Sequence, residues 1–338
     1  MRIAVLGLGF MGSTHLKALR SIPDAEVVAV YSQDEKKLSG DLTKIQGNTG
    51  GPGARMDFRK VSKYREVRQV FDDERVEAVD ICLPTHLHAP VAMEALHAGK
   101  HVLVEKPMAL DAASAAHMIA EARKHRRTLM VAQVLRFFPA YEALREHVTS
   151  GKLGTTRAAM FRRRCAAPVW GGWLADPQQS GGGVFDLLIH DVDMALHLFG
   201  KPESISATGY EALGSGIDLI TAELHYSSHL TVTIAGGWHH PKSFPFSMEY
   251  TVVTDGGTLE YDSAARPPGL YCADGKVEAL VAPDKDGYRA EIEYFLDCCR
   301  HDSPPERCRP EESADAVALM RAMLDARTRN GDKIRCNL

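Results

Sequence analysis

The stretch RIAVLGLGFMG, residues 2–12, decides the fold of the N-terminal part of the chain. Its apolar first half predicts a short buried strand, and residues 13–21 continue with apolar positions at helical spacing. Between them, Gly7 allows a tight turn, Gly9 lets the backbone approach a pyrophosphate, and Gly12 lets helix and strand pack closely. A dinucleotide-binding strand, turn and helix is therefore the favoured interpretation, and a glycine-rich turn with a structural role only is the alternative.

Strands and helices alternate outward from this unit. Further β-type runs occupy residues 26–31, 76–83, 101–104 and 128–133. Helical patterns occupy residues 89–98 and a segment that Asp111 caps and that continues to about residue 124. This alternation is typical of an α/β domain with a doubly wound parallel sheet, a Rossmann domain, which we expect to cover residues 1–128. Residues 39–63 depart from the rhythm, and their glycine-rich stretch 47–53 predicts a long surface loop of unknown role.

The pattern changes after Gln133. Helical spacing is found at residues 139–150, 184–199, 289–300 and 310–328, and a strand pattern at residues 156–164. Between residues 203 and 281 we expect six to eight strands, because β-type runs alternate there with short turn signals. The predicted second domain, residues 129–338, is thus an α+β domain with a large, mainly antiparallel open sheet.

Composition limits the possible partners and compartments. The 338 residues carry 40 Lys and Arg against 44 Asp and Glu, a net charge of −4, so we expect neither nucleic acid nor a membrane surface as a partner. No apolar run reaches the roughly 20 residues that span a bilayer, and the first residues do not resemble a signal peptide. Seven scattered cysteines without CxxC spacing predict neither a disulfide framework nor a zinc site. These observations favour a cytoplasmic protein.

The end of the second predicted strand indicates the type of dinucleotide. An acidic residue there would bind the ribose 2′-hydroxyl and repel a 2′-phosphate. This chain has Ser32 and Gln33 instead, with Lys36 and Lys37 one turn away, although Asp34 and Glu35 intervene. The sequence therefore predicts NAD or NADP with a slight preference for NADP.

Glu105, Lys106 and Pro107 follow the strand predicted at residues 101–104. Ligands of open α/β sheets bind at the carboxyl ends of parallel strands, and a following proline restricts Lys106 to extended geometry. A lysine that points into the site and a solvated lysine in a surface turn are both compatible with these residues.

The densest group of polar residues lies in the predicted helix at 184–199. Asp186 and His190 are four residues apart and therefore share a helix face, where a carboxylate can orient an imidazole for general acid–base catalysis. Asp193 and His197 continue the same stripe, which makes a metal site an alternative. The third possibility is helix capping by Asp186, with a histidine that has only a structural role.

Several further residues are candidate substrate contacts. Arg136, Trp173 and Tyr288 carry side chains suited to sugar recognition, although a single aromatic residue is more often part of the packing. Arg162, Arg163 and Arg164 alternate sides of a predicted strand, and Arg163 could favour an acidic sugar. The other histidines have no partner at a useful spacing.

Taken together, the motifs resemble the GFO/IDH/MocA family of NAD(P)-dependent oxidoreductases. The likeness runs from the glycine turn through Pro84, Thr85 and His88, the Glu105-Lys106-Pro107 element, Arg136, and the three glycines before Asp186 and His190. It implies that Lys106, Asp186 and His190 line the reacting centre between the domains: His190 as acid/base, Asp186 to orient it, and Lys106 on the reacting oxygen. It makes a metal site improbable.

The resemblance also implies the remaining assignments. The expected cofactor-binding residues are Gly7, Gly9, Phe10, Met11, Gly12, Ser32, Gln33, Leu83, Pro84, Thr85, His88, Glu105, Lys106 and Gln133. The expected substrate-binding residues are Lys106, Arg136, Arg163, Trp173, Asp186, His190 and Tyr288. The implied activity is hydride transfer between the nicotinamide and a secondary alcohol or ketone of a sugar, sugar derivative or cyclitol, in a homodimer or homotetramer formed through the C-terminal sheet. The alternatives are a glycoside hydrolase that uses tightly bound NAD transiently, and a non-catalytic NAD(P)-sensing protein.

Overall fold

The computed structural model describes residues 1–47, 53–169, 172–280 and 285–338, which form two compact units. The first unit comprises residues 1–134 and 286–314, and the second comprises residues 135–285 and 315–338. Neither unit is one continuous piece of chain. The expected single division after residue 128 differs from this arrangement, because the strand at 129–132 belongs to the first sheet and a C-terminal segment returns to the first unit.

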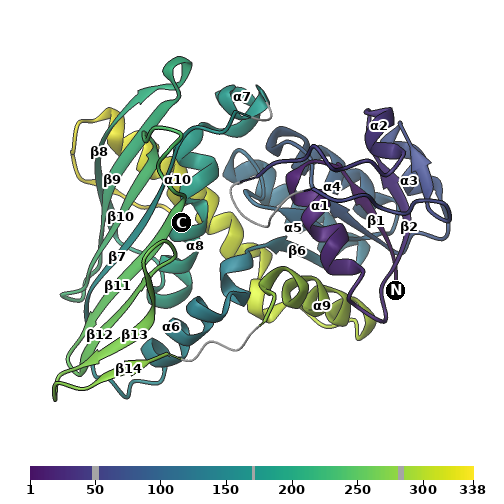
Figure 1. Ribbon diagram of the computed structural model, residues 1–338. Coiled ribbons are helices and arrows are strands. Elements are labelled where there is room, and N and C mark those ends of the chain that lie inside the picture. The colour runs from purple at the N-terminus through teal and green to yellow at the C-terminus, as the bar shows by residue number, and fades with distance from the viewer. Residues whose placement is uncertain (48–52, 170–171, 281–284) are drawn as a thin grey trace. The chain divides into compact units, whose positions relative to one another are not determined.

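The described part of the first unit contains a six-stranded parallel sheet in the order β3-β2-β1-β4-β5-β6 (Figure 1). Its strands are β1 (Arg2–Leu6), β2 (Glu26–Tyr31), β3 (Ser62–Tyr64), β4 (Ala78–Ile81), β5 (His101–Glu105) and β6 (Leu129–Ala132). β1 and β4 lie side by side at the centre of the sheet, and the later strands are added outward from them in opposite directions. In doubly wound folds the ligand binds at this switch point, outside the carboxyl ends of the strands. The predicted Rossmann architecture is confirmed.

Helices on this sheet are α1 (Phe10–Leu19), α2 (Glu35–Leu38), α3 (Val67–Asp72), α4 (His88–His97) and α5 (Ala112–His125). Asp111 caps α5 as predicted, since its carboxylate accepts the N–H of Ser114 at 2.8 Å. The returning segment adds α9 (Gly287–Arg300), which packs on α1, and a short 3₁₀ helix, η5 (Glu306–Cys308). A second, one-turn 3₁₀ helix, η1 (Thr85–Leu87), follows β4.

The predicted surface loop at residues 39–63 is partly core. Leu42, Met56 and Phe58 are buried, and a β-bridge joins Asp41 to Arg55. The prediction of a surface loop was wrong for these three residues, because their apolar side chains are buried and the bridge brings the two arms of the segment together. Of the glycine-rich stretch, only Gly47 and Gly53 lie within the described residues.

The described residues of the second unit form a nine-stranded, mainly antiparallel sheet in the order β14-β13-β12-β11-β7-β10-β9-β8-β15 (Figure 1). Only the pair of β7 and β10 is parallel among the ladders described. The bounds are β7 (Thr156–Cys165), β8 (Ser204–Ala212), β9 (Ile217–His225), β10 (Thr231–Trp238), β11 (Ser247–Thr254), β12 (Gly257–Asp262), β13 (Arg266–Cys272), β14 (Val277–Ala279) and β15 (Ile334–Arg335). This confirms the predicted second architecture.

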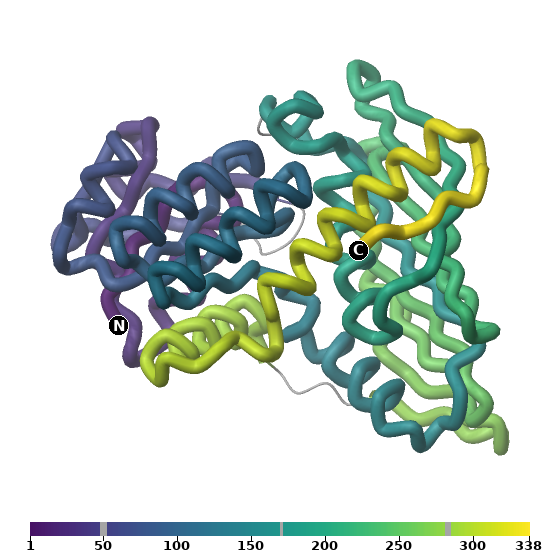
Figure 2. Tube along the Cα trace, turned by 180° about the vertical axis from the view of Figure 1, so that it is seen from behind, coloured from purple at the N-terminus to yellow at the C-terminus, as the bar shows by residue number. Residues whose placement is uncertain are grey.

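Helices cover one face of this sheet. They are α6 (Pro139–Thr149), α7 (Pro177–Ser180), α8 (Gly183–Phe199) and the larger part of α10 (Pro310–Thr328), with short 3₁₀ turns η2 (Val134–Phe137), η3 (Gly172–Ala175) and η4 (Leu213–Ser215). Figure 2 shows the C-terminal half of α10 running across the sheet, where Arg327 pairs with Asp218. The helix α8 contacts β7, β9 and β10, and most of its residues are buried. No helix of the described chain is long and apolar enough to cross a membrane.

Candidate active site

The glycine turn after β1 has room for a ligand at one position. Gly7 has a φ of +98°, and a Cβ there would lie 2.4 Å from the carbonyl oxygen of Cys82. A Cβ on Gly12 would lie 1.9 Å from the carbonyl oxygen of Gly7. A Cβ on Gly9 would meet nothing within 4 Å, and Gly9 caps α1 without a side-chain hydrogen bond. Packing therefore requires glycine at Gly7 and Gly12, whereas the space at Gly9 suits a phosphate bound at the start of a helix.

Gln133 provides a second observation that fits a cofactor. It follows β6 at the carboxyl edge of the sheet, is only 1% exposed, and both atoms of its amide have no hydrogen-bond partner within the described chain. A buried amide without partners costs about 1–3 kcal/mol, so such groups usually meet a ligand or water. The first unit thus fits a dinucleotide, with the glycine turn for the phosphates and Gln133 as an amide partner for the bound molecule.

The residues after β2 are arranged as a turn. The Ser32 hydroxyl accepts the backbone N–H of Asp34 at 3.1 Å, and Asp34 in turn caps α2. Gln33 and Lys36 are exposed. The Asp34 carboxylate therefore accepts hydrogen bonds within the turn as the cap of α2. The cofactor contacts expected of Ser32 and Gln33 stay predictions.

His88 holds two loops together near the same sheet edge. Its Nδ1 lies 2.8 Å from the carbonyl oxygen of Pro107, and its Nε2 lies 2.7 Å from that of Leu83. The ring is 1% exposed, and burial lowers its pKa. These contacts place His88 as a connection between the end of β4 and the turn after β5, and the cofactor contacts expected of Leu83, Pro84, Thr85 and His88 stay predictions.

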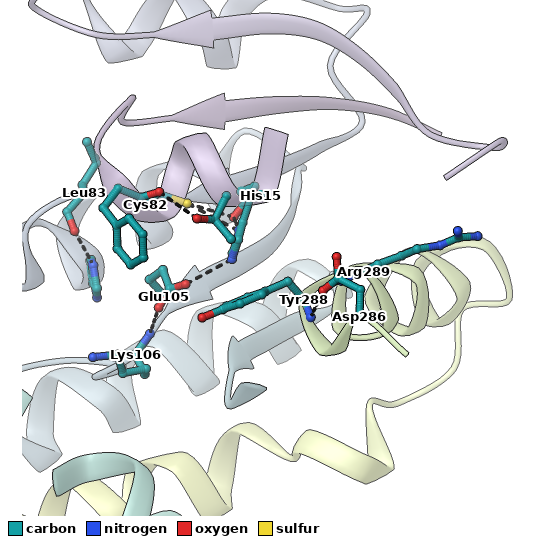
Figure 3. Close-up of polar contacts among 12 residues, drawn as sticks. His15, Cys82, Leu83, Glu105, Lys106, Asp286, Tyr288 and Arg289 are labelled. Carbon is teal, nitrogen blue, oxygen red and sulfur yellow. Dashed lines mark hydrogen bonds and ion pairs between the residues drawn. The ribbon is translucent and has the colours of Figure 1, made fainter. Parts of the chain in front are cut away.

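Glu105 ends β5 beside a buried histidine, and Lys106 follows it (Figure 3). One oxygen of Glu105, Oε1, lies 3.1 Å from Nε2 of His15, and the other, Oε2, accepts the backbone N–H of Lys106 at 3.0 Å. Nδ1 of His15 donates to Asp80, with distances of 2.9 and 3.0 Å to the two carboxylate oxygens. His15 therefore lies between two carboxylates.

The charge of His15 follows from this environment. Burial by itself would lower its pKa, but the neighbouring Asp80 carboxylate and Cys82 raise the pKa of His15 well above its ordinary value. Burial also raises the pKa of Cys82, whose Sγ lies 3.5 Å from His15 Nδ1. His15, Asp80 and Cys82 lie close enough together to hold a metal ion, but both ring nitrogens of His15 contact carboxylates, Asp80 at 2.9 Å and Glu105 at 3.1 Å, so we interpret the cluster as an ion-pair network.

In the second unit, α8 separates its polar residues into two sets. Asp191 accepts Nε and Nη2 of Arg163 at 2.7 and 3.1 Å, and both side chains are buried. Asp193 accepts Nε and Nη2 of Arg136 at 2.8 and 2.6 Å, in an ion pair with no exposed surface. Asp186 and His190 instead lie on the partly exposed side of the helix.

The geometry at the start of α8 explains its position. Gly182 has a φ of +99°, and a Cβ on Gly183 would lie 2.5 Å from the ring of Trp238. The N–H of Val184 donates to Asp218 at 2.8 Å. The glycines therefore allow the helix to begin against β10, and Asp186 follows in its first turn.

The other predicted substrate residues have different environments. Arg136 and Arg163 are in the buried ion pairs described above, so the geometry gives no support to contacts between these guanidinium groups and a substrate. Trp173 lies partly exposed in η3, and Tyr288 lies in the first turn of α9. Figure 3 shows the Tyr288 ring pointing toward Glu105. The roles of Trp173 and Tyr288 stay predictions.

Sequence reasoning missed the cluster of His15 and Asp80. A signal was present, since Asp80 is a charged residue within an otherwise apolar buried strand and His15 follows the glycine turn by three residues. Buried charges need partners, so this pattern predicts an ion pair in the core. The hydrogen bonds between His15 of α1 and Asp80 of β4 show which residues meet.

Comparison with known proteins agrees with this architecture. Residues 1–133 match the model of an oxidoreductase family with an NAD-binding Rossmann fold, and residues 141–260 match the GFO/IDH/MocA C-terminal domain. The chain belongs to the GFO/IDH/MocA family. It is thus an oxidoreductase, and the predicted family and enzyme class, a dehydrogenase or reductase of CH–OH groups, are confirmed.

Several named relatives are dehydrogenases of cyclitols or sugars. The chain is 30% identical to myo-inositol 2-dehydrogenase of Thermotoga maritima over 66% of its own length and 63% of the relative, so this match spans less than two thirds of that protein. It is 27% identical to scyllo-inositol 2-dehydrogenase (NADP⁺) of Bacillus subtilis over 88% of this chain and 87% of the relative. Among solved structures, a levoglucosan dehydrogenase in complex with NADH and levoglucosan has the same fold, with a TM-score of 0.84, 16% identity and full coverage of both chains.

Proposed function

We propose that this protein transfers a hydride between a nicotinamide cofactor and a secondary alcohol or ketone of a sugar, sugar derivative or cyclitol. The family and the names of its members support this substrate class. The open space at Gly9 and the partnerless amide of Gln133 support a bound dinucleotide. When bound, the nicotinamide supplies the hydride acceptor or donor.

The observation that carries the proposal is the division of polar residues on α8. Asp191 and Asp193 are neutralised by buried arginines, so they serve the core. Asp186 and His190, four residues apart, share the partly exposed side of the same helix. A histidine and a carboxylate presented in this way are suited to proton transfer near neutral pH.

We assign three roles to the chain. His190 takes the hydroxyl proton during oxidation and returns it during reduction, because loss of a hydride from a carbinol carbon requires loss of that proton. Asp186 orients the imidazole and favours its protonated form. Lys106 donates a hydrogen bond to the reacting oxygen and stabilises the negative charge that develops on it.

Cofactor preference is the finer part of the proposal. We propose a preference for NADP, since Ser32 and Gln33 follow β2, and of the two acids after them Asp34 caps α2 and Glu35 pairs with Arg65. The NADP⁺ in the name of the Bacillus subtilis relative supports the same choice. Titrations with NADH and NADPH, followed by nicotinamide fluorescence, distinguish the two.

The open face of the nine-stranded sheet supports a homodimer or homotetramer. Met160, Val253 and Tyr271 are exposed on β7, β11 and β13. Large apolar groups on one sheet are typical of an interface. Sedimentation equilibrium tests this, and a monomer at micromolar concentration contradicts it.

A screen of sugars and inositols with NAD⁺ and NADP⁺ tests the activity. We expect reduced cofactor to appear with the correct substrate, and His190→Ala to lower turnover by about 100-fold or more, the scale of a positioned acid/base. Full turnover in His190→Ala contradicts the assignment. Release of free sugar from a glycoside without net reduction of cofactor indicates the hydrolase alternative, and binding without any turnover indicates the sensor alternative.

A further inference from the structure

A cluster of buried ionisable residues lies next to Lys106, and the proposed chemistry does not use it. Its members come from four elements: His15 of α1, Asp80 of β4, Glu105 of β5 and Glu291 of α9. His15, Asp80 and Glu291 have no exposed surface, and Glu105 is 5% exposed. Burying an unpaired charge lowers the stability of the fold, so four ionisable groups buried in one place indicate a role other than packing.

The contacts in this cluster form a continuous chain that ends at Lys106 (Figure 3). Asp80 accepts Nδ1 of His15, Nε2 of His15 contacts Oε1 of Glu105, and Oε2 of Glu105 accepts the N–H of Lys106. The distances are 2.9, 3.1 and 3.0 Å. The first two contacts are buried ion pairs, and the third is a hydrogen bond to a carboxylate, a type stronger than a hydrogen bond between neutral groups.

The other neighbour of Lys106 is also held by a buried histidine. Nδ1 of His88 lies 2.8 Å from the carbonyl oxygen of Pro107. Lys106 therefore lies between two residues, Glu105 and Pro107, that contact buried imidazoles from two different helical segments. Such contacts on both sides restrict the backbone from which the Lys106 side chain extends.

Glu291 lies in the same cluster but outside this chain of contacts. Both of its carboxyl oxygens lack a hydrogen-bond partner among the described residues. Burial raises its pKa well above the ordinary value; His15 opposes this rise, and Glu105 and Asp80 add to it. Glu291 is therefore a buried acid from α9 that holds neither His15 nor Lys106 by a hydrogen bond within the described residues.

We propose that His15, anchored by Asp80, is a positioning residue that acts through Glu105 to hold Lys106 in its working orientation. The proposal rests on the proposed function, in which Lys106 contacts the reacting oxygen. Displacement of a catalytic group by about 1 Å can lower a rate by up to about 100-fold. A rigid support for Lys106 can therefore be worth the destabilisation that several buried charges bring to the fold.

Glu105→Gln tests the proposal with the smallest change in shape. A carboxylate has two acceptor oxygens, whereas an amide has one, so glutamine cannot accept from both His15 and Lys106. We expect kcat to fall by about 10-fold or more, with KM within about 3-fold of wild type. Glu291→Gln is the matched control, the same change in the same cluster, and should leave kcat within about 2-fold. Wild-type kcat in Glu105→Gln, or equal losses in both variants, overturns the proposal.

Amide hydrogen exchange of Lys106, followed by NMR, gives a measurement that does not depend on activity. We expect exchange at Lys106 to be about 10-fold faster in Glu105→Gln than in wild type, and unchanged at Val104 in the middle of β5. Equal exchange at Lys106 in both proteins overturns the positioning role even if the enzyme is active. Conversely, full turnover in His190→Ala contradicts the proposed function and leaves this exchange measurement as the test of the positioning role.

Discussion

His15 and Glu105 form a buried ion pair, with Nε2 of the imidazole 3.1 Å from Oε1 of the carboxylate. Glu105 is the last residue of β5, and the next residue is Lys106. The pair connects the helix that follows the glycine turn with the strand end that carries a predicted catalytic lysine. The same part of the first unit thus contains the candidate cofactor turn and the support of that lysine.

The pH dependence of stability should report the buried acid of this cluster. The raised pKa of Glu291 means that the folded state keeps a proton that the unfolded chain releases above its ordinary pKa of 4.5. Stability from this group is therefore fully present below that pH and is lost as the pH rises toward the folded pKa. Glutamine does not titrate. As the pH rises, the free energy of unfolding of Glu291→Gln should therefore increase relative to that of wild type by up to about 1.4 kcal/mol per pH unit.

Urea unfolding of both proteins at several pH values between about 5 and 8 checks this slope. His15 contributes in the same direction, because its pKa is also raised, but it is present in both proteins. A constant difference between the two curves contradicts a neutral Glu291 in the folded state.

Alanine at two glycines should separate folding from cofactor binding. Gly9 has a φ of −84° and open space at its Cβ position, so Gly9→Ala should change stability by less than about 1 kcal/mol and weaken binding of the reduced cofactor by about 10-fold or more. Gly12→Ala places a methyl group 1.9 Å from a backbone oxygen and should lower the melting temperature strongly. Thermal unfolding and fluorescence titration measure the two effects. Normal binding by Gly9→Ala contradicts the phosphate site.

Gln133→Met should stabilise the free protein and weaken cofactor binding. Methionine has a similar length and no polar atoms, so it removes a buried amide that has no partner in the described chain. The expected gain in unfolding free energy is about 1 kcal/mol or more without cofactor. Denaturation curves with and without NADPH provide the comparison. If the variant is less stable without cofactor and binds it normally, Gln133 is a packing residue.

Alanine substitutions at the neighbouring residues Arg163 and Arg162 should have very different effects on stability. Arg163→Ala leaves Asp191 buried without its partner and should cost about 3–5 kcal/mol of stability. Arg162 is 42% exposed in its pair with Glu249, and its replacement by alanine should cost about 1 kcal/mol or less. Chemical denaturation of both variants measures this. Loss of activity toward acidic sugars alone, in a stable Arg163→Ala protein, would restore the substrate contact predicted from the sequence.

Local sequence patterns predicted most elements of both sheets. Residues 26–31 and 310–328 form β2 and α10 with the predicted bounds, and Asp111 caps α5. These elements have strong periodicity or a clear cap, so that neighbouring residues contain the signal. The short elements α2, β3 and α3 were missed, because they contain few residues and surround a glycine-rich stretch.

Long-range packing explains what the sequence did not predict. The return of residues 286–314 to the first unit depends on contacts between α9 and α1, which are far apart in the chain. Likewise, alternation predicted that Arg162 and Arg163 lie on opposite faces of β7, but only the position of α8 shows that Arg163 is on the covered face.

The sequence by itself determined the glycine turn, the alternation of strands and helices, and the motifs that contain Lys106, Asp186 and His190, since each is a property of nearby residues. Only the tertiary structure decided that Asp80, His15 and Glu105 meet beside Lys106, and that Asp191 and Asp193 form buried ion pairs with arginines. The physical reason is that buried charges must find partners, and those partners come from strands and helices that only the folded sheets bring together.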